Sequence, residues 1–263
     1  MKILIIIQAR IASSRLFGKV MLQILNRPVL SLMYERVRMS RYYSDIVIAT
    51  STNPLDQNII QYAERENIKV FAGDEYDLLD RHYKIAKMHK ANAVVKIPSD
   101  CPLIDPLIID NVLSFFIKNH QKFDYVSNLH PATYPDGNDV EIFTFSALEK
   151  SWKEAKLEYQ REHTTPYIWE NTDIFRIGNV EWETGFEFFD KYRLTLDYKE
   201  DFELIKAVYE NLYPINHSFG VNEIIQFLDK NPEIYDLNKK HLGKYWYDNH
   251  LDGIKNIDNY KKK

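Results

Sequence analysis

The sequence predicts an α/β protein built on a doubly wound, mainly parallel sheet. The first observation is an uninterrupted aliphatic run, Ile3–Ile7, which is rich in β-branched residues and too short to cross a membrane. Such a run is typical of a central strand that is buried on both faces. The second observation is that similar runs recur at 46–49 and 93–97, separated by stretches with the apolar spacing of helices. Strands and helices that alternate in this way form a parallel sheet covered on both sides.

The remaining elements follow from the same patterns. The expected helices lie at residues 28–40, 55–66, 77–90, 106–119, 146–156, 159–170, 200–212, 221–230 and 238–248. The expected strands lie at residues 3–7, 46–49, 69–71, 93–97, 123–127, 140–145, 174–180 and 193–196. Asp105 and Pro106 mark a helix start, because an aspartate caps the first turn and proline suits the first helical position. We expect one domain over residues 1–263, with a C-terminal helical extension from residue 213 that Tyr245, Trp246 and Tyr247 anchor to the body.

Composition excludes several classes of protein. The 38 acidic and 34 basic residues give a formal charge of −4, and the basic residues are scattered apart from the run Lys261–Lys263. This distribution argues against a nucleic-acid binder and predicts no such partner. The single cysteine, Cys101, excludes an intrachain disulfide and a cysteine-rich zinc site. No signal peptide and no segment of membrane-spanning length is visible, so we expect a soluble cytoplasmic protein without a membrane partner.

Three cations, Arg10, Arg15 and Lys19, follow the first strand in a loop that contains the small residues Ala12–Ser14 and Gly18. Ligands of open α/β sheets bind beyond the carboxyl ends of the strands, where small residues let the backbone approach an anion. The loop therefore predicts a site for a nucleoside triphosphate. It is neither a Walker loop nor a dinucleotide fingerprint, since it lacks the spacing of both motifs. The alternative is that the three cations are solvated loop charges.

Two aspartates end strands that should reach the same edge of the sheet. Asp100 follows the strand at 93–97, and Asp197 ends the strand at 193–196. Taken singly, Asp100 suits a turn, and Asp197 suits a helix cap three residues before Glu200. Taken together, two carboxylates that face a triphosphate suit Mg²⁺, which takes oxygen ligands and is often held by one or two carboxylates and phosphate oxygens.

The loop at 6–20, I-I-Q-A-R-x-x-S-S-R-L-x-G-K-V, resembles the signature loop of the sugar-activating cytidylyltransferases. That family includes CMP-KDO synthetase and acylneuraminate cytidylyltransferase, and the chain is most similar to its spore-coat polysaccharide biosynthesis branch. Further segments agree in order along residues 3–210: ATSTNPLD at 49–56, DLLDRHY at 77–83, SDCPLIDP at 99–106, YPDGNDVEIF at 134–143, REHTTPYI at 161–168 and RLTLDYKEDFELI at 193–205. The chain departs from the branch at Phe17, where proline is usual, and at Ala12 and Ser99, where glycine is usual.

The resemblance implies a nucleotide-diphospho-sugar transferase-like, Rossmann-like fold with a nucleotide-binding half at 1–122 and an acceptor-binding half at 123–212. It implies that Asp100 and Asp197 bind the metal. The implied nucleotide-binding residues are Gln8, Ala9, Arg10, Ser14, Arg15, Lys19, Ala49, Thr50, Gly73 and Asp100. The implied catalytic residues are Arg10, Lys19, Asp100 and Asp197, of which the cations hold the β- and γ-phosphates. For the motif DLLDR we expect a structural ion pair between Asp80 and Arg81.

A polar segment, His130–Asp139, is long for a simple connection and follows the nucleotide-binding half. We expect it to lie exposed over the crevice and to become ordered when the acceptor binds, and the alternative is a solvated surface loop. The residues expected to recognise the acceptor are Asp136, Asp139, Glu141, Arg161, Glu162 and His163.

These observations predict a Mg²⁺-dependent nucleotidyltransferase that transfers CMP from CTP to a sugar or sugar acid, releases pyrophosphate, serves surface polysaccharide synthesis and acts as a homodimer. One alternative uses another nucleoside triphosphate or a sugar phosphate acceptor. A glycosyltransferase that consumes a nucleotide sugar is another alternative, although the D-x-D tripeptide that it predicts is absent from the sequence. A catalytically silent binding protein is the third, favoured if the departures at Ala12, Phe17 and Ser99 disable the phosphate site.

Overall fold

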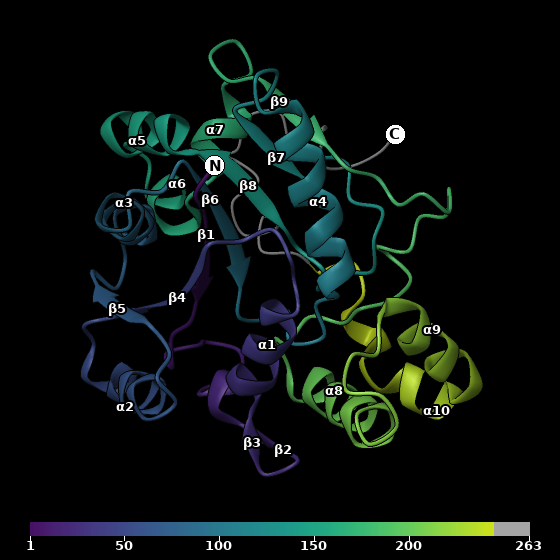
Figure 1. Ribbon diagram of the computed structural model, residues 1–263. Coiled ribbons are helices and arrows are strands. Elements are labelled where there is room, and N and C mark those ends of the chain that lie inside the picture. Colours follow the sequence, from purple (N-terminus) through teal and green to yellow (C-terminus); the bar gives the residue numbers. More distant parts are fainter. Residues whose placement is uncertain (245–263) are drawn as a thin grey trace.

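The computed structural model describes residues 1–244, and a seven-stranded sheet runs through their centre (Figure 1). The strand order is β5-β4-β1-β6-β8-β7-β9, and four of the six pairings are parallel. The strands are β1 (Ile3–Gln8), β4 (Asp45–Ser51), β5 (Val70–Gly73), β6 (Ala93–Pro98), β7 (Tyr125–Ser127), β8 (Glu141–Thr144) and β9 (Ile177–Asn179). A short hairpin of β2 (Gln23–Ile24) and β3 (Arg27–Pro28), which the sequence patterns did not predict, stands apart from this sheet.

Helices cover both faces of the sheet, which confirms the doubly wound α/β fold. Figure 1 shows α3, α5 and α6 on one side, and α1, α4 and α8 on the other. The helices are α1 (Val29–Arg38), α2 (Gln57–Arg65), α3 (Leu78–Met88), α4 (Pro106–Asn119), α5 (Phe145–Glu154), α6 (Glu158–His163), α7 (Pro166–Glu170), α8 (Lys199–Leu212), α9 (Val221–Lys230) and α10 (Pro232–Tyr235). Among residues 1–244, no helix combines the length and the apolar character needed to cross a bilayer.

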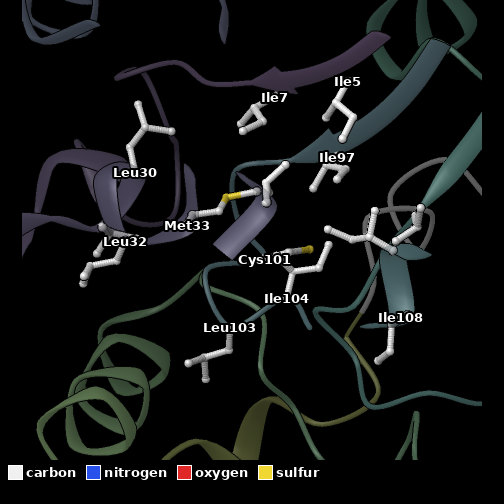
Figure 2. Packing of buried hydrophobic residues seen from close by; sticks show 14 of the residues in the cluster. Ile5, Ile7, Leu30, Leu32, Met33, Ile97, Cys101, Leu103, Ile104 and Ile108 are labelled. Atoms are coloured by element: carbon white, nitrogen blue, oxygen red, sulfur yellow. The ribbon is translucent and has the colours of Figure 1, made fainter. Parts of the chain in front are cut away.

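β1 is the central strand that its aliphatic run predicts. Ile3, Ile5 and Ile7 belong to the apolar cluster on the α1 and α4 face, whereas Leu4 and Ile6 belong to the cluster on the opposite face. Figure 2 shows the first cluster, in which Ile5 and Ile7 face side chains of α1, of β6 and of the segment that leads to α4. Since successive strand residues point to opposite faces, a strand buried on both sides needs apolar residues at every position.

The carboxyl ends of three parallel strands meet at one edge of the sheet. Gln8 at the end of β1 pairs with Ala49 of β4 and with Pro98 of β6. The loops that follow β1 and β6 therefore leave the sheet side by side, as the sequence predicts for a ligand site. The predicted start of α4 is confirmed, because the Asp105 side chain accepts a hydrogen bond from the Leu107 N–H at 2.8 Å.

The segment at 193–196 is not a strand of the sheet, contrary to the prediction. Its backbone instead crosses two loops: the Leu194 N–H donates to the Asp136 carbonyl at 2.8 Å, and the Leu196 N–H donates to the Asp100 carbonyl at 2.7 Å. Buried apolar side chains and β-propensity thus indicate an extended, buried segment without specifying its partner. The crossing carries Asp197 to the same edge as Asp100.

The predicted helix at 159–170 is two helices, α6 and α7. Thr164 between them has a φ of 71°, which a helix does not contain. Pro166 begins α7, a position at which helices tolerate proline, and Thr165 before it keeps helical dihedral angles, so the break lies at Thr164. One apolar pattern is therefore divided into two short helices.

The prediction that the segment at 130–139 lies exposed is wrong. Thr133, Tyr134, Asp136 and Asn138 are all buried. The side chain of Asn138 accepts from the Asp105 N–H at 3.0 Å and donates to the Pro135 carbonyl at 3.2 Å. Polar composition predicts exposure only where the polar groups lack partners within the protein, and here they have them.

The C-terminal part follows the prediction over its first helix, since α9 spans the predicted residues 221–230. A 3-10 helix, Asp236–His241, occupies the beginning of the helix predicted at 238–248. The rest of that prediction, including Tyr245, Trp246 and Tyr247, lies outside the described residues.

Candidate active site

A cavity of about 300 Å³ lies at the carboxyl ends of β1 and β6. Its lining comes from the loop after β1, from α3 and α6, and from the segments at 129–141 and 193–197. Most residues that the sequence predicts for a site line this cavity: Gln8, Ala9, Arg10, Ser14, Arg15, Lys19, Asp100, Asp136, Asp139, Glu141, Glu162, His163 and Asp197. Polar side chains from distant parts of the chain thus converge on one hollow, which is the usual form of a ligand site.

Lys19 connects the loop after β1 to the two predicted metal ligands. Its Nζ atom donates to Asp197 Oδ1 at 2.9 Å and to the Leu196 carbonyl at 2.7 Å, and it lies 3.6 Å from Asp100 Oδ2. Arg15 Nη2 donates to the same Asp197 Oδ1 at 2.9 Å. The Lys19 side chain is only 11% exposed, so the alternative of a solvated loop charge is wrong for this residue.

Asp197 is an ion-paired carboxylate rather than a helix cap. The N-cap of α8 is Tyr198, and the Asp201 carboxylate accepts from the N–H groups of Asp197 and Tyr198 at 2.9 Å. Burial raises the pKa of the Asp197 carboxyl, but Lys19 and Arg15 outweigh this effect and hold the pKa below its usual range. Asp197 is therefore ionised at neutral pH.

Arg193 joins three carboxylates behind the cavity. Its guanidinium lies 3.0 Å from Asp201, 3.2 Å from Asp197 and 3.3 Å from Asp136, and its side chain is 1% exposed. A planar group with five donors suits such a role, because it can bond several carboxylates at fixed angles. Arg193 thereby sets the position of Asp197 relative to Asp136.

Asp100 and Asp197 together fit a hard divalent cation bound with a nucleotide. Both carboxylates approach Lys19 Nζ, and the hydrogen bond from Leu196 to the Asp100 carbonyl holds their backbones side by side. Within residues 1–244, no group of three or more His, Cys, Asp and Glu side chains is spaced to hold a metal by itself. Two carboxylates that need phosphate oxygens to complete the coordination are the arrangement that Mg²⁺ commonly takes.

The far end of the cavity is rich in carboxylates. Lys96 Nζ donates to Glu141 Oε1 at 2.5 Å, and the Tyr125 hydroxyl donates to Glu141 Oε2 at 2.6 Å. Burial raises the pKa of Glu141, but Lys96 more than offsets this and holds the pKa below its usual range. Burial, followed by the charges of Asp100 and Glu141, raises the pKa of Asp139 to about 7. The carboxylates of this end therefore differ in charge state according to their partners.

Four predicted residues do not line the cavity. Arg161 donates from Nε to Asp77 at 3.0 Å and from Nη1 to the Trp152 carbonyl at 2.7 Å, so its guanidinium is engaged elsewhere. Ala49 and Thr50 are buried within β4, and Gly73 is buried at the end of β5.

The predicted ion pair between Asp80 and Arg81 is wrong. Asp80 bonds Lys84 at 2.6 Å, one helical turn away, and accepts from Trp152 Nε1 at 2.9 Å. Arg81 lines the cavity instead. Consecutive residues on a helix point in different directions, which prevents the pairing.

Sequence reasoning missed four cations of the cavity, namely Arg81, Lys96, Arg193 and Lys244. Lys96 carries a usable signal, because a lysine inside the apolar run of β6 is costly to bury without a partner. Arg193 gives no such signal, since its three carboxylates are brought to it by the fold.

Several known proteins are similar to this chain. A family model described as cytidylyltransferase matches residues 4–219. An uncharacterized protein of Methanocaldococcus jannaschii is 40% identical, over 90% of this chain and 95% of the relative. The spore coat polysaccharide biosynthesis protein SpsF of Bacillus subtilis is 31% identical, over 88% of this chain and 95% of the relative. A 3-deoxy-manno-octulosonate cytidylyltransferase of Geobacter sulfurreducens is 31% identical over a shorter match, 45% of this chain and 47% of the relative.

Two solved structures are also similar to this chain. A cytidylyltransferase from Leptospira borgpetersenii serovar Hardjo-bovis has a TM-score of 0.84 and 34% identity, over 94% of this chain and 99% of that one. A CMP:2-keto-3-deoxy-manno-octonic acid synthetase in complex with CTP has a TM-score of 0.60 and 16% identity, over 81% of this chain and all of that one. The second likeness concerns the fold alone.

Proposed function

Since this chain belongs to the cytidylyltransferase family and is a nucleotidyltransferase, we propose that it transfers CMP from CTP to a sugar or sugar acid and releases pyrophosphate. The observation that carries this proposal is the meeting of Arg15 and Lys19 with Asp100 and Asp197 at one end of the cavity. Cations for a triphosphate and carboxylates for a divalent metal are the two requirements of nucleotidyl transfer.

The acceptor hydroxyl oxygen attacks the α-phosphorus in line and loses its proton to solvent, and the bond from the α-phosphorus to the leaving pyrophosphate breaks. Arg10, Ser14, Arg15 and Lys19 bind the triphosphate and absorb the charge that develops on the pyrophosphate. Positioning and electrostatic stabilisation supply most of the acceleration in such a reaction, so no covalent intermediate is needed. Asp100 and Asp197 would hold Mg²⁺, which supplies Lewis-acid polarisation of the phosphate oxygens when bound.

The two halves of the cavity have separate roles in this proposal. Residues 1–122 provide the nucleotide site. Ala49, Thr50 and Gly73 are left out of it because they are buried at the ends of their strands and do not line the cavity. Residues 123–212 provide the acceptor site, and residues 213–263 form the C-terminal extension. The acceptor would contact Asp136, Asp139, Glu141, Glu162 and His163, all of which line the cavity. Arg161 is left out because its donors are engaged with Asp77 and Trp152.

The acceptor class and the cellular setting rest on the relatives. The Bacillus subtilis relative is named for spore coat polysaccharide biosynthesis, and the Geobacter sulfurreducens relative is named for an eight-carbon sugar acid. We therefore place the protein in surface polysaccharide synthesis in the cytoplasm, where CTP is made. A homodimer through the inserted segment is part of the proposal, because this segment exposes Leu157, Ile174 and Phe186.

Pyrophosphate release tests the proposal. The four ribonucleoside triphosphates are each combined with a panel of ulosonic acids, neutral sugars and sugar phosphates, with Mg²⁺ or with EDTA. The expected result is release with CTP, Mg²⁺ and an acceptor that carries no phosphate, and no release with EDTA. Lys19→Ala is expected to lose activity, since each charge-assisted contact contributes about 1.5–3 kcal/mol. Release that needs a sugar phosphate, or that persists in EDTA, contradicts the proposal.

A further inference from the structure

The C-terminal extension reaches the cavity through Lys244. This lysine is part of the same lining as Arg15 and Asp197. The family model ends at residue 219, so Lys244 lies outside the part of the chain that the model matches. The cavity therefore contains a cation that membership of the family does not account for.

Two side chains anchor the segment that precedes Lys244. The buried Asn238 side chain donates to the Arg193 carbonyl at 2.9 Å. The His241 ring stacks on the Tyr198 ring, with the ring centroids 3.8 Å apart and the planes inclined by 4°. Both anchors lie on the stretch of chain that leads into α8 and lines the cavity, so the segment is fixed to that stretch.

A tight turn then brings Lys244 to the cavity. Gly243 has a φ of 73°, in the left-handed region that glycine adopts at no steric cost. The Lys244 N–H donates to the His241 carbonyl, and the Lys244 carbonyl accepts from Arg193 Nη1, both at 3.3 Å. The backbone of Lys244 is thus bonded to the arginine that holds Asp197 in position.

The ammonium group of Lys244 is available for an anion. Within residues 1–244 it forms no ion pair, and its Nζ atom lies 3.5 Å from His241 Nδ1, at the limit of a hydrogen bond. Arg15 and Lys19, in contrast, are both bonded to Asp197. An anion that binds Lys244 therefore displaces no carboxylate from it.

The position of Tyr198 indicates which part of a substrate would meet Lys244. Lys244 Nζ and Arg15 Cζ each lie 5.7 Å from the centroid of the Tyr198 ring. Lys244 is therefore close to the end of the cavity at which Arg15 would bind the triphosphate. The other end contains Asp139 and Glu141, whose negative charge disfavours an anion. Lysine is a compact cation with three donors, which suits phosphate oxygens.

We propose that Lys244 binds the β- and γ-phosphates of the nucleoside triphosphate and the pyrophosphate that leaves. This inference rests on the proposed function and adds the C-terminal extension to its triphosphate site. The ammonium group donates to non-bridging phosphate oxygens and stabilises the charge that develops on the leaving pyrophosphate. CMP has neither of these two phosphates, so Lys244 contributes to the binding of CTP and pyrophosphate but not to that of CMP.

Calorimetric binding of inorganic pyrophosphate and of CMP, each with Mg²⁺, tests the assignment. Lys244→Met removes the charge, and Lys244→Arg keeps it. Lys239→Met is the matched control, because Lys239 is an exposed lysine of the same 3-10 helical segment and pairs with Asp236. In Lys244→Met the Kd for pyrophosphate is expected to rise roughly 10-fold, the lower end of the range for a charge-assisted hydrogen bond, because this side chain is exposed. Lys244→Arg should retain most of the wild-type affinity, and the Kd for CMP should be unchanged in all three variants.

Lys244→Met should melt at the wild-type temperature, because an exposed side chain without an ion pair contributes little to stability. An unchanged Kd for pyrophosphate in this variant would overturn the inference, as would an equal loss of affinity for pyrophosphate and CMP. A loss of the same size in Lys239→Met would also overturn it, since the effect would then come from net charge rather than from contact. Each of these results leaves pyrophosphate release by the wild type intact. A wild-type protein that releases pyrophosphate from no triphosphate would instead refute the proposed function.

Discussion

The two ends of the cavity hold charge in different ways. At the end proposed to bind phosphate, the phosphate end, Arg15 and Lys19 bond Asp197 across 182 and 178 positions of sequence, and the Asp100 side chain is still 31% exposed. At the end proposed to bind the acceptor, the acceptor end, Lys96, Glu141 and Tyr125 form a closed network on adjacent strands. A bound metal–nucleotide complex can replace the ion pairs of the first set, because the cations would then bond phosphates and the carboxylates would bond the metal. The complex offers no such partners to the second set, so its three residues keep their positions.

Breaking the closed network should have the largest effect. Lys96→Met leaves Glu141 charged and buried, and the free energy of unfolding is expected to fall by about 3–5 kcal/mol, as for other broken buried pairs. Urea denaturation measures this loss. Lys84→Met, which removes an exposed lysine from a comparable ion pair, should cost much less.

The pH dependence checks the same pair. The pKa of Glu141 lies below its ordinary value of 4.5, so its contribution to stability is present above that pH and is lost as the pH falls through the lowered value. Glu141→Gln should lack this part of the acid loss. If the denaturation midpoint of Lys96→Met equals that of wild type, the network is not the rigid element described above.

Removing a charge at the phosphate end should instead affect catalysis. Asp197→Asn is expected to lower kcat by roughly 10²–10³-fold, the scale of losing one fixed group that stabilises the transition state. Its melting temperature should also fall, since Lys19, Arg15 and Arg193 all lose a charged partner. Asp236→Asn, at an exposed ion pair, serves as the control for charge removal. Full activity in Asp197→Asn would remove this residue from the metal site.

Asp139 distinguishes the two ends kinetically. At pH 8, above the Asp139 pKa of about 7, Asp139→Asn keeps the shape of the side chain and removes its charge. The KM for the acceptor is then expected to rise by about 10-fold or more, as for one lost charge-assisted hydrogen bond. The KM for CTP should stay within a factor of two or three of wild type, because the lost contact binds the acceptor and not the nucleotide. Initial-rate kinetics with each substrate varied in turn measure both constants. Asp173→Asn, at an exposed position, is the control, and an equal rise in both constants would place Asp139 outside the acceptor site.

The sequence predicts the parallel half of the fold well and the edge loops less well. Apolar runs such as Ile3–Ile7 are determined by burial on both faces, which is a local property of the chain. The segment at 193–196 looks the same locally, yet its partners are the carbonyls of Asp100 and Asp136, which only the folded chain brings near. Pattern therefore predicts that a segment is buried and extended, but does not reveal what it bonds.

The candidate site shows the same division. Arg15, Lys19 and Asp100 follow strand ends, so their convergence was predictable from the rule that ligands bind at that edge. Arg161 matched a motif but turned toward Asp77, because a helix surface offers several directions that spacing alone does not distinguish. Arg81 went unrecognised for the opposite reason: its neighbour in sequence, Asp80, appeared to be its partner.

The smallest effect is expected at Phe17, where the loop departs from the proline that is usual in the branch it resembles. The side chain is 64% exposed, and no hydrogen bond of its N–H is found within residues 1–244, so proline would cost neither packing nor a donor. The adjacent Gly18, with a φ of 68°, makes the turn that presents Lys19. Phe17→Pro should therefore stabilise the fold by about 0.4–1 kcal/mol, through a stiffer unfolded chain. The KM for CTP should remain close to that of wild type, because Lys19 is already fixed by Asp197 and the Leu196 carbonyl. Thermal melting and initial rates measure both, and a large fall in KM would mean that the loop of this chain is loosened by the departure from proline.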